Sequence, residues 1–186
     1  MLAFFQAHSF LIGQIFGFSA MFVGIIMYQF KKHRTIMLLM MLCASLWCLH
    51  FVCLGKYTAV FMNLLNVVRS VLFSFRGRKW ADSILIPVVI CISSLVISAV
   101  TWEGPLSLLP AVAAVSSTLA NWQTDTRRLK LLTIPVCVGW FVYNLFGHSY
   151  AGMANETFVL GSVFVSLYRI RKETKASASE SGTAAV

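Results

Sequence analysis

Glu156 is the residue of this 186-residue chain with the clearest capacity for chemistry. It is the one acidic side chain that lies inside an apolar segment and away from the segment's ends. If that segment crosses a bilayer, an ionised carboxylate there costs about 3 kcal/mol or more unless it is paired or hydrated. Such acids mark solute or proton pathways, whereas a protonated carboxyl that only joins helices is the alternative. The sequence leaves both interpretations open.

Arg69 carries the opposite charge inside another apolar segment, one to two helical turns before the basic residue Arg76. Its long side chain either reaches the nearby membrane surface or turns inward. If it turns inward, Glu156 is the candidate counter-charge, and Asn66 belongs to the same candidate coupling or ion-pair group. His50 is a lone histidine in an apolar run, where a helix-packing role is favoured over proton transfer.

Two amides and two indoles form a second set, which is suited to binding a solute. Asn63 and Asn155 offer both hydrogen-bond donors and acceptors. Trp47 and Trp140 lie well inside apolar segments, where an indole stacks on a sugar or nucleoside ring more readily than it anchors at an interface. Helix packing explains the two amides equally well. We predict that these four residues line a substrate site.

The sequence contains no arrangement typical of an enzyme, such as a serine elbow, a glycine-rich phosphate loop or carboxylates paired at one depth. Five cysteines fall in apolar stretches without metal-ligand spacing: Cys43, Cys48, Cys53, Cys91 and Cys137. We therefore expect a protein that is not an enzyme and that holds no cofactor or metal.

The composition requires a lipid environment for all of these residues. Hydrophobic residues make up 59% of the chain and charged residues only 11%, with a mean hydropathy of +0.80. Such a chain cannot cover a water-facing surface with polar groups, which excludes a soluble domain. The net charge of +9 is spread in clusters at the ends of apolar runs, so the expected partner is the bilayer and not nucleic acid.

The length accommodates seven membrane-spanning helices of about 20 residues each in a single domain over residues 1–171. The first apolar run lacks the leader and cleavage site of a signal peptide, so we expect it to be retained. The tail, 172–186, is polar and is predicted to be disordered. The predicted spans are 9–30, 35–54, 57–75, 83–102, 105–123, 129–147 and 150–169.

Basic residues alternate between the connections of these helices. The first, third and fifth connections and the tail carry thirteen Lys and Arg residues, against Lys56 alone in the alternate connections. By the positive-inside rule, the amino terminus lies outside and the carboxyl tail lies in the cytoplasm. The thirteen are Lys31, Lys32, Arg34, Arg76, Arg78, Lys79, Arg127, Arg128, Lys130, Arg169, Arg171, Lys172 and Lys175.

The chain also repeats itself at a nearly constant spacing. Tyr28-Gln29 returns as Trp122-Gln123 after 94 residues, and a second pattern returns after 92 or 93 residues. Repeat 1 then covers about 9–75, repeat 2 covers about 105–171, and helix 83–102 links them so that both have the same orientation. The second pattern is Trp47, His50, Gly55, Ala59 and Asn63, matched by Trp140, Tyr143, Gly147, Ala151 and Asn155.

The segment from Trp140 to Gly147, followed by Asn155, resembles the tryptophan, tyrosine, glycine and asparagine pattern of the SWEET and SemiSWEET sugar-transporter superfamily. That resemblance implies an all-α membrane fold of two parallel three-helix bundles joined by a linker helix. Over the whole chain, with Asn66-Val-Val-Arg69 and Glu156, the sequence resembles more closely the YgjV family of bacterial inner-membrane proteins, which has no assigned substrate.

The chain departs from the transporter pattern in one respect. The proline-glutamine pair expected in the first helix of each repeat is missing, and Tyr28-Gln29 and Trp122-Gln123 stand near those places. This departure puts in doubt a rocking mechanism that bends equivalent helices at prolines.

Two functions follow from the sequence. The first is a carrier in the bacterial inner membrane for a small polar solute, sugar-like or nucleoside-like, working by alternating access between the two bundles. A vitamin-precursor carrier of the similar PnuC architecture is a variant of it. The second is a receptor, partner-binding or structural membrane protein that does not transport. The oligomeric state stays open, a homo-oligomer included.

The topology can be tested by labelling single cysteines in a cysteine-free background. Cysteines at positions 80 and 175 should be protected from a membrane-impermeant reagent in intact cells, and cysteines at 56 and 148 should react. The reason is that moving a basic cluster across the membrane opposes the insertion bias. Labelling from outside at 80 or 175 would contradict the orientation.

Overall fold

The structure of the protein is a computed structural model that describes residues 2–27, 33–75 and 77–183. Side chains are described for residues 8–26, 38–39, 41–75 and 77–172. The predicted repeat element Tyr28-Gln29 and the basic residues Lys31, Lys32 and Arg76 lie outside the described residues. Every regular element in the described ranges is helical.

Seven α-helices and one short 3₁₀ helix make up the described chain, which confirms the predicted all-helical fold. The first helix begins at Leu2, seven residues before its predicted start, and the fifth span opens with the 3₁₀ turn. The elements are α1 (Leu2–Met27), α2 (His33–Cys53), α3 (Tyr57–Ser74), α4 (Leu85–Val100), η1 (Pro105–Ser107), α5 (Leu108–Trp122), α6 (Thr126–Phe146) and α7 (Tyr150–Thr183).

The ends of the helices follow from local chemistry. Gly55, with φ of +68°, lets the chain reverse between α2 and α3 in a conformation that a side chain would disfavour. Asp125 caps α6, because its carboxylate accepts hydrogen bonds from the backbone N–H groups of Arg127 (3.1 Å) and Arg128 (3.4 Å). Pro105 starts η1, where a missing N–H group costs nothing.

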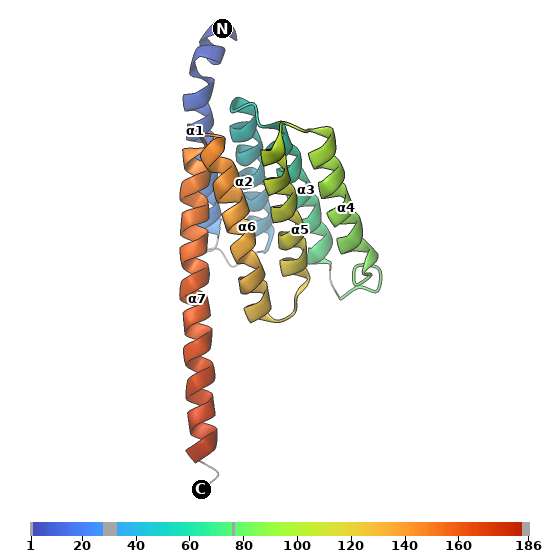
Figure 1. Ribbon diagram of the computed structural model, residues 1–186, viewed down its shortest axis with the longest axis vertical. Helices are drawn as coiled ribbons and strands as arrows, with labels where there is room; N and C mark the ends of the chain where they lie inside the picture. Colours follow the sequence, from blue (N-terminus) through green and yellow to red (C-terminus); the bar gives the residue numbers. More distant parts are fainter. Residues whose placement is uncertain (1, 28–32, 76, 184–186) are drawn as a thin grey trace.

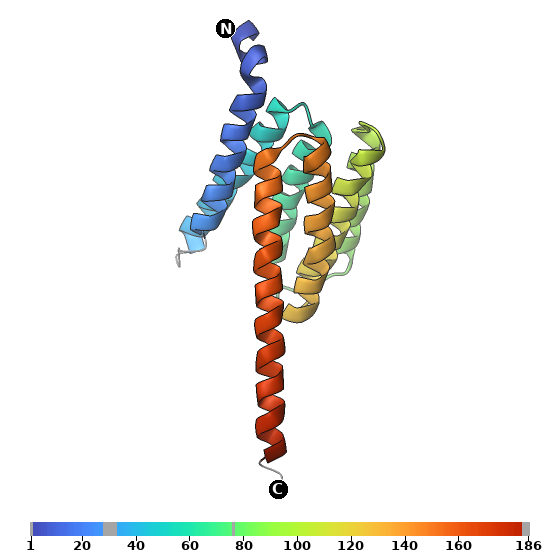
Figure 2. The ribbon, with the colours of Figure 1, turned by 60° about the vertical axis from the view of Figure 1, so that its left-hand side comes forward.

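Six of the helices form a closed ring in the order α1, α2, α3, α5, α6 and α7 (Figures 1 and 2). The ring closes where α7 packs against α1, and α4 lies outside it, against α3 and α5. Helices α1, α3, α5 and α7 run in one direction, and the others run in the opposite direction (Figure 1).

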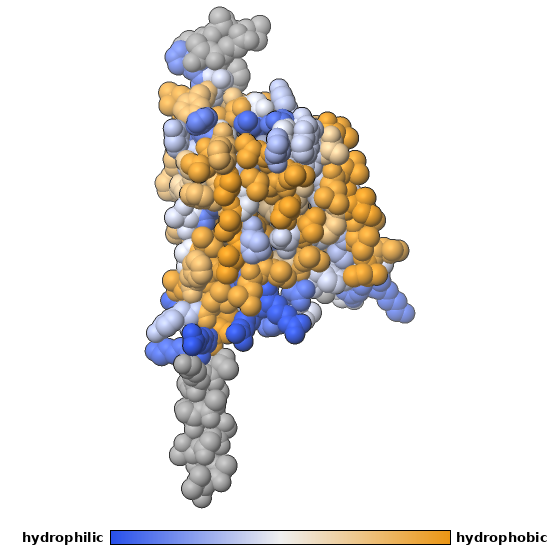
Figure 3. Space-filling view, in the orientation of Figure 1, coloured by the Kyte–Doolittle hydropathy of each residue, from blue (hydrophilic) through white to orange (hydrophobic). Residues whose placement is uncertain are grey.

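An apolar surface surrounds this bundle. Large hydrophobic side chains such as Phe22, Leu64 and Val89 are exposed along the helices, and strongly hydrophilic residues gather at the lower end in Figure 3. Three described helical segments are long and apolar enough to cross a membrane, namely His8–Ile26, Tyr57–Ser74 and Thr126–Phe146, and Met41–Cys53 and Leu85–Val100 are shorter apolar helices. The described chain is therefore an all-helical protein with a lipid-facing surface.

Helix α7 is the longest element and extends to Thr183. Its second half projects below the ring in both ribbon views (Figures 1 and 2). The helix thus continues past residue 172, where the sequence analysis expects order to end, and disorder of the tail stays a prediction.

A buried histidine joins α1, α2 and the start of α7. His50 is fully buried, with Nδ1 at 2.6 Å from the carbonyl oxygen of Gly13 and Nε2 at 2.7 Å from the hydroxyl of Ser149. A neutral ring satisfies both neighbours by donating from Nδ1 and accepting at Nε2. Gly17 makes room for the ring, because a Cβ there would lie 2.7 Å from His50 Nδ1.

Gln14 ties α1 to α7 beside this histidine. Its Nε2 donates to the carbonyl of His148 at 2.8 Å, and its Oε1 accepts from the backbone N–H of Ala151 at 3.1 Å. The first N–H groups of a helix have no partner within the helix, so this side chain replaces a cap at the start of α7. The joint formed by His50 and Gln14 closes the ring.

We predict that His50→Ala lowers the stability of the folded protein. The substitution leaves the Gly13 carbonyl and the Ser149 hydroxyl without their imidazole partner, which costs about 1 to 3 kcal/mol. The melting temperature of the purified protein in detergent should fall by several degrees. Leu49→Ala is the control, because Leu49 precedes His50 on α2 and is 45% exposed. Equal melting temperatures for the two variants would contradict the role of His50 in joining α1, α2 and the start of α7.

Candidate functional site

A cavity of about 370 Å³ lies inside the ring between α1, α2, α3, α6 and α7. All four residues of the predicted substrate site line it, namely Trp47, Asn63, Trp140 and Asn155. They come from four different helices that are far apart in the sequence. The structure therefore brings together the residues that the sequence selected, and their role in binding stays a prediction.

The two amides of this cavity form only local hydrogen bonds. Asn63 donates from Nδ2 to the carbonyl of Ala59 at 2.9 Å, one turn back in the same helix. Asn155 donates from Nδ2 to Oε1 of Glu156, the next residue, at 3.1 Å. Among the described residues neither amide bonds to another helix, so the structure gives no support to the alternative that they join helices.

Aromatic rings form one wall of the cavity and connect α2 with α6. Phe51 lies between the two indoles, with ring centroids 6.0 Å from Trp47 and 6.1 Å from Trp140. Trp140 also meets Tyr143 edge to face at 5.8 Å. Aromatic contacts of this kind stabilise by about 0.5 to 1.5 kcal/mol each and hold the rings in place. The wall thus offers a preformed apolar surface to a ligand.

Asn144 is a cavity residue that the sequence analysis missed. It is 2% exposed, it lines the cavity, and its Oδ1 has no hydrogen-bond partner in the described structure. Gly152 makes room for it, because a Cβ at that position would lie 2.4 to 2.6 Å from the amide atoms of Asn144. A buried amide oxygen without a partner is costly unless a ligand or water donates to it.

A second cavity, of about 200 Å³, lies beside the first between α3, α4, α5, α6 and α7. The two cavities share the wall formed by Asn66, Trp140, Glu156 and Val159. Glu156 therefore lies where the two cavities meet. Arg69 lines the second cavity but not the first.

Arg69 turns inward and does not reach the membrane surface, since it is 5% exposed. Nη1 donates to the carbonyl of Ala114 at 3.3 Å and lies 3.4 Å from Thr118 Oγ1, while Nη2 donates to Asn66 Oδ1. Both Arg69 and Glu156 are described, and the structure records no ion pair between them. The direct pairing that the sequence raised is thus not present in this conformation.

His50, the remaining candidate for proton coupling, lines neither cavity. It lies in the joint of α1, α2 and α7 with both ring nitrogens engaged. Packing accounts for its contacts. No group of three or more metal-ligating side chains occurs in the part of the chain that the structure describes.

A family model described as Imp-YgjV, bacterial inner membrane protein, matches residues 11–174. The chain belongs to the Imp-YgjV family. The match extends from α1 into α7, so it includes every residue of both cavities of the Imp-YgjV protein. Comparisons with curated proteins and with solved structures gave no match.

Gly152→Ala should destabilise the Imp-YgjV protein, because the new Cβ would overlap the buried amide of Asn144. Overpacking of this kind costs about 1 to 3 kcal/mol. Gly161→Ala is the matched control on the same helix, since nothing lies within 4 Å of its built Cβ. The melting temperature should fall for the first variant and stay or rise slightly for the second. An unchanged value for Gly152→Ala would contradict the position of Asn144.

Proposed function

We propose that the protein is a membrane carrier for a small polar solute that works by alternating access between two three-helix bundles, α1–α3 and α5–α7. The observation that carries this proposal is the central cavity, where an indole and an amide from each bundle face one space. Carriers built from repeats bind their substrate where the repeats meet, because rocking of the halves exposes that place alternately to each side.

The helix packing supports two parallel repeats with α4 as the linker. A half turn about the bundle axis that exchanges α1 with α5, α2 with α6 and α3 with α7 preserves the order of the ring. Under this rotation the contact of α3 with α5 corresponds to the contact of α7 with α1, and both are present. Helices α1 and α5 also run in the same direction (Figure 1).

The two cavities give independent support, because their linings correspond at a spacing of 93 residues. Seven lining residues of the first cavity, advanced by 93 positions, give lining residues of the second. At this spacing Asn63 corresponds to Glu156, whereas the sequence pattern pairs it with Asn155 at a spacing of 92. The first cavity is lined by all three helices of the first bundle together with α6 and α7, and the second is lined by all three helices of the second bundle together with α3 and α4. The corresponding pairs are Met21 and Ala114, Gly24 and Ser117, Cys43 and Val136, Ala44 and Cys137, Trp47 and Trp140, Asn63 and Glu156, and Asn66 and Val159.

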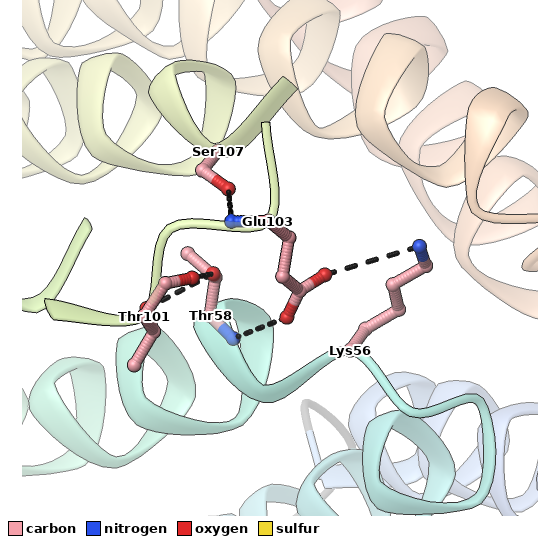
Figure 4. A network of polar contacts seen from close by, with 5 residues as sticks. All are labelled: Lys56, Thr58, Thr101, Glu103 and Ser107. Atoms are coloured by element: carbon pink, nitrogen blue, oxygen red, sulfur yellow. Dashed lines mark hydrogen bonds and ion pairs between the residues drawn. The ribbon is translucent and has the colours of Figure 1, made fainter. Parts of the chain in front are cut away.

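The same spacing relates the starts of α3 and α7. The backbone N–H of Thr58 donates to Glu103 Oε1 at 3.2 Å (Figure 4), and the backbone N–H of Ala151 donates to Gln14 Oε1 at 3.1 Å. Glu103 lies in the loop before the second proposed repeat and accepts from the first repeat. Gln14 lies in the first proposed repeat and accepts from the second. Both contacts lie at the same end of the ring, where they hold the halves together.

Two further contacts join the start of α3 to the loop before α5, which contains Glu103. Lys56 Nζ lies 3.9 Å from its second carboxylate oxygen, and Thr58 Oγ1 donates to the carbonyl of Thr101 at 2.6 Å (Figure 4). The described conformation is then one in which this end is shut. By the distribution of basic residues, we assign this end to the outside and the carboxyl end of α7 to the cytoplasm.

Reconstituted protein tests the carrier function. A ligand-stabilisation screen of sugars, nucleosides and amino acids identifies solutes that raise the melting temperature, since a ligand of the folded state stabilises it by mass action. Each such solute should then exchange across vesicles that contain the protein and not across empty vesicles.

Asn63→Ala and Asn155→Ala should reduce this exchange about tenfold or more with melting temperatures close to the wild type, because neither amide joins helices. Ser45→Ala is the control, since Ser45 is exposed and bonds its own helix. Solute binding without exchange would favour the non-transporting alternative. If both amide variants instead melt several degrees lower than the wild type, the result would support a role of Asn63 and Asn155 in helix packing.

A further inference from the structure

The second cavity contains two opposite charges that do not touch. Arg69 faces it from α3 and Glu156 faces it from α7. In hydrocarbon, opposite charges either pair directly or each find another partner, because an isolated charge is costly. Here the pair is not made, so the guanidinium of Arg69 requires another partner, and so does the carboxylate of Glu156 whenever it is ionised.

Every partner that the structure gives Arg69 is neutral. The guanidinium bonds to a backbone carbonyl, a threonine hydroxyl and the Asn66 amide, and its buried Nε has no partner among the described residues. A guanidinium presents five N–H donors in a fork that fits a carboxylate. The unfilled partner of Arg69 is therefore an anionic group, and a carboxylate fits its geometry best.

Glu156 excludes a simple anion from the same space. Its Oε1 accepts from Asn155 Nδ2, and the residue lines the same cavity as Arg69. An anion alone would meet the carboxylate of Glu156, and a cation alone would meet the guanidinium of Arg69. A molecule with one carboxylate and one ammonium group satisfies both residues at once.

The size and the walls of the cavity restrict this molecule further. Its volume is about 200 Å³, against about 370 Å³ for the first cavity, so the second cavity suits the smaller solute. Ser117 and Thr133 supply hydroxyl groups, and Trp140 supplies an apolar surface. These dimensions are those of an amino acid with a small side chain.

We propose that the second cavity binds a small zwitterionic amino acid, with its carboxylate on Arg69 and its ammonium group on Glu156. This inference rests on the proposed carrier function and names its solute class. It departs from the sugar-like or nucleoside-like solute expected from the sequence, because those solutes leave Arg69 without an anionic partner. Glu156 also lines the first cavity, so the ammonium group would lie where the two cavities meet.

The purified protein in detergent tests the proposal with small probes. L-Alanine and L-serine should raise the melting temperature in a saturable manner, and the midpoint of the titration gives an apparent dissociation constant. Propionate, ethylamine and glucose are the matched probes that carry only the carboxylate, only the amine or neither charge. They should give no saturable shift over the same concentrations.

Variants identify the residues that hold the probe. Arg69→Gln and Glu156→Gln should each weaken alanine binding about ten- to a hundredfold, since a charged hydrogen bond is lost in a buried site. Arg78→Gln is the control for net charge, because Arg78 is exposed after α3. Arg69→Lys keeps the charge without the fork and should bind with intermediate affinity. If Arg69→Gln does not fold, Arg69→Lys and Glu156→Gln decide the question.

Three results would overturn the inference: no saturable shift with alanine or serine, an equal shift with propionate, or unchanged alanine affinity in the folded variants. Vesicle exchange separates this inference from the carrier function. Alanine binding that depends on Arg69 and Glu156 without exchange would uphold the site and refute the carrier. Exchange of glucose by protein that does not bind alanine would uphold the carrier and refute the site.

Discussion

Hydrocarbon offers no hydrogen-bond partner to a polar group, and the polar geometry of this protein follows from that constraint. Each buried polar side chain must find its partners within the bundle. His50 and Gln14 do so by joining helices at the end of the ring. Among the described residues, Asn144, Arg69 and Tyr143 each keep a buried polar atom without a partner. Asn144 lines the first cavity and Arg69 lines the second, so a bound molecule could supply the missing partner there.

Small residues determine where these polar groups can lie. Gly17 and Gly152 remove a Cβ at points where the His50 ring and the Asn144 amide approach a neighbouring helix. Such close approach lets helix backbones pack tightly, which is the main attraction between helices in lipid. At Asn144 the same space positions an amide toward the cavity. Close packing and a polar lining therefore depend on the same positions.

The sequence predicts the helices well, because long apolar runs and alternating basic connections are local signals. It also selects Trp47, Trp140, Asn63 and Asn155, which the structure places around one cavity, because the repeat marks them. The sequence does not indicate Asn144, because the residue 93 positions earlier is Phe51 and the repeat therefore contains no matching polar residue. The direction of the Arg69 side chain depends on how α5 packs against α3, which no local pattern encodes.

The two proposed bundles touch at two places, where α3 packs against α5 and where α1 packs against α7. The chain connects the bundles only at the first of these. Helix α4 follows α3 in the chain, precedes α5 and packs against both, so it tethers the two proposed bundles covalently on that side. Between α1 and α7 no chain segment connects the proposed bundles, and the contacts there include the hydrogen bonds of Gln14 and His50 and the edge-to-face contact of Phe10 with Tyr150. If the two proposed bundles move apart, the motion is expected to be asymmetric, because α4 tethers them on one side whereas on the other side the buried contacts of Gln14 and His50 have to break.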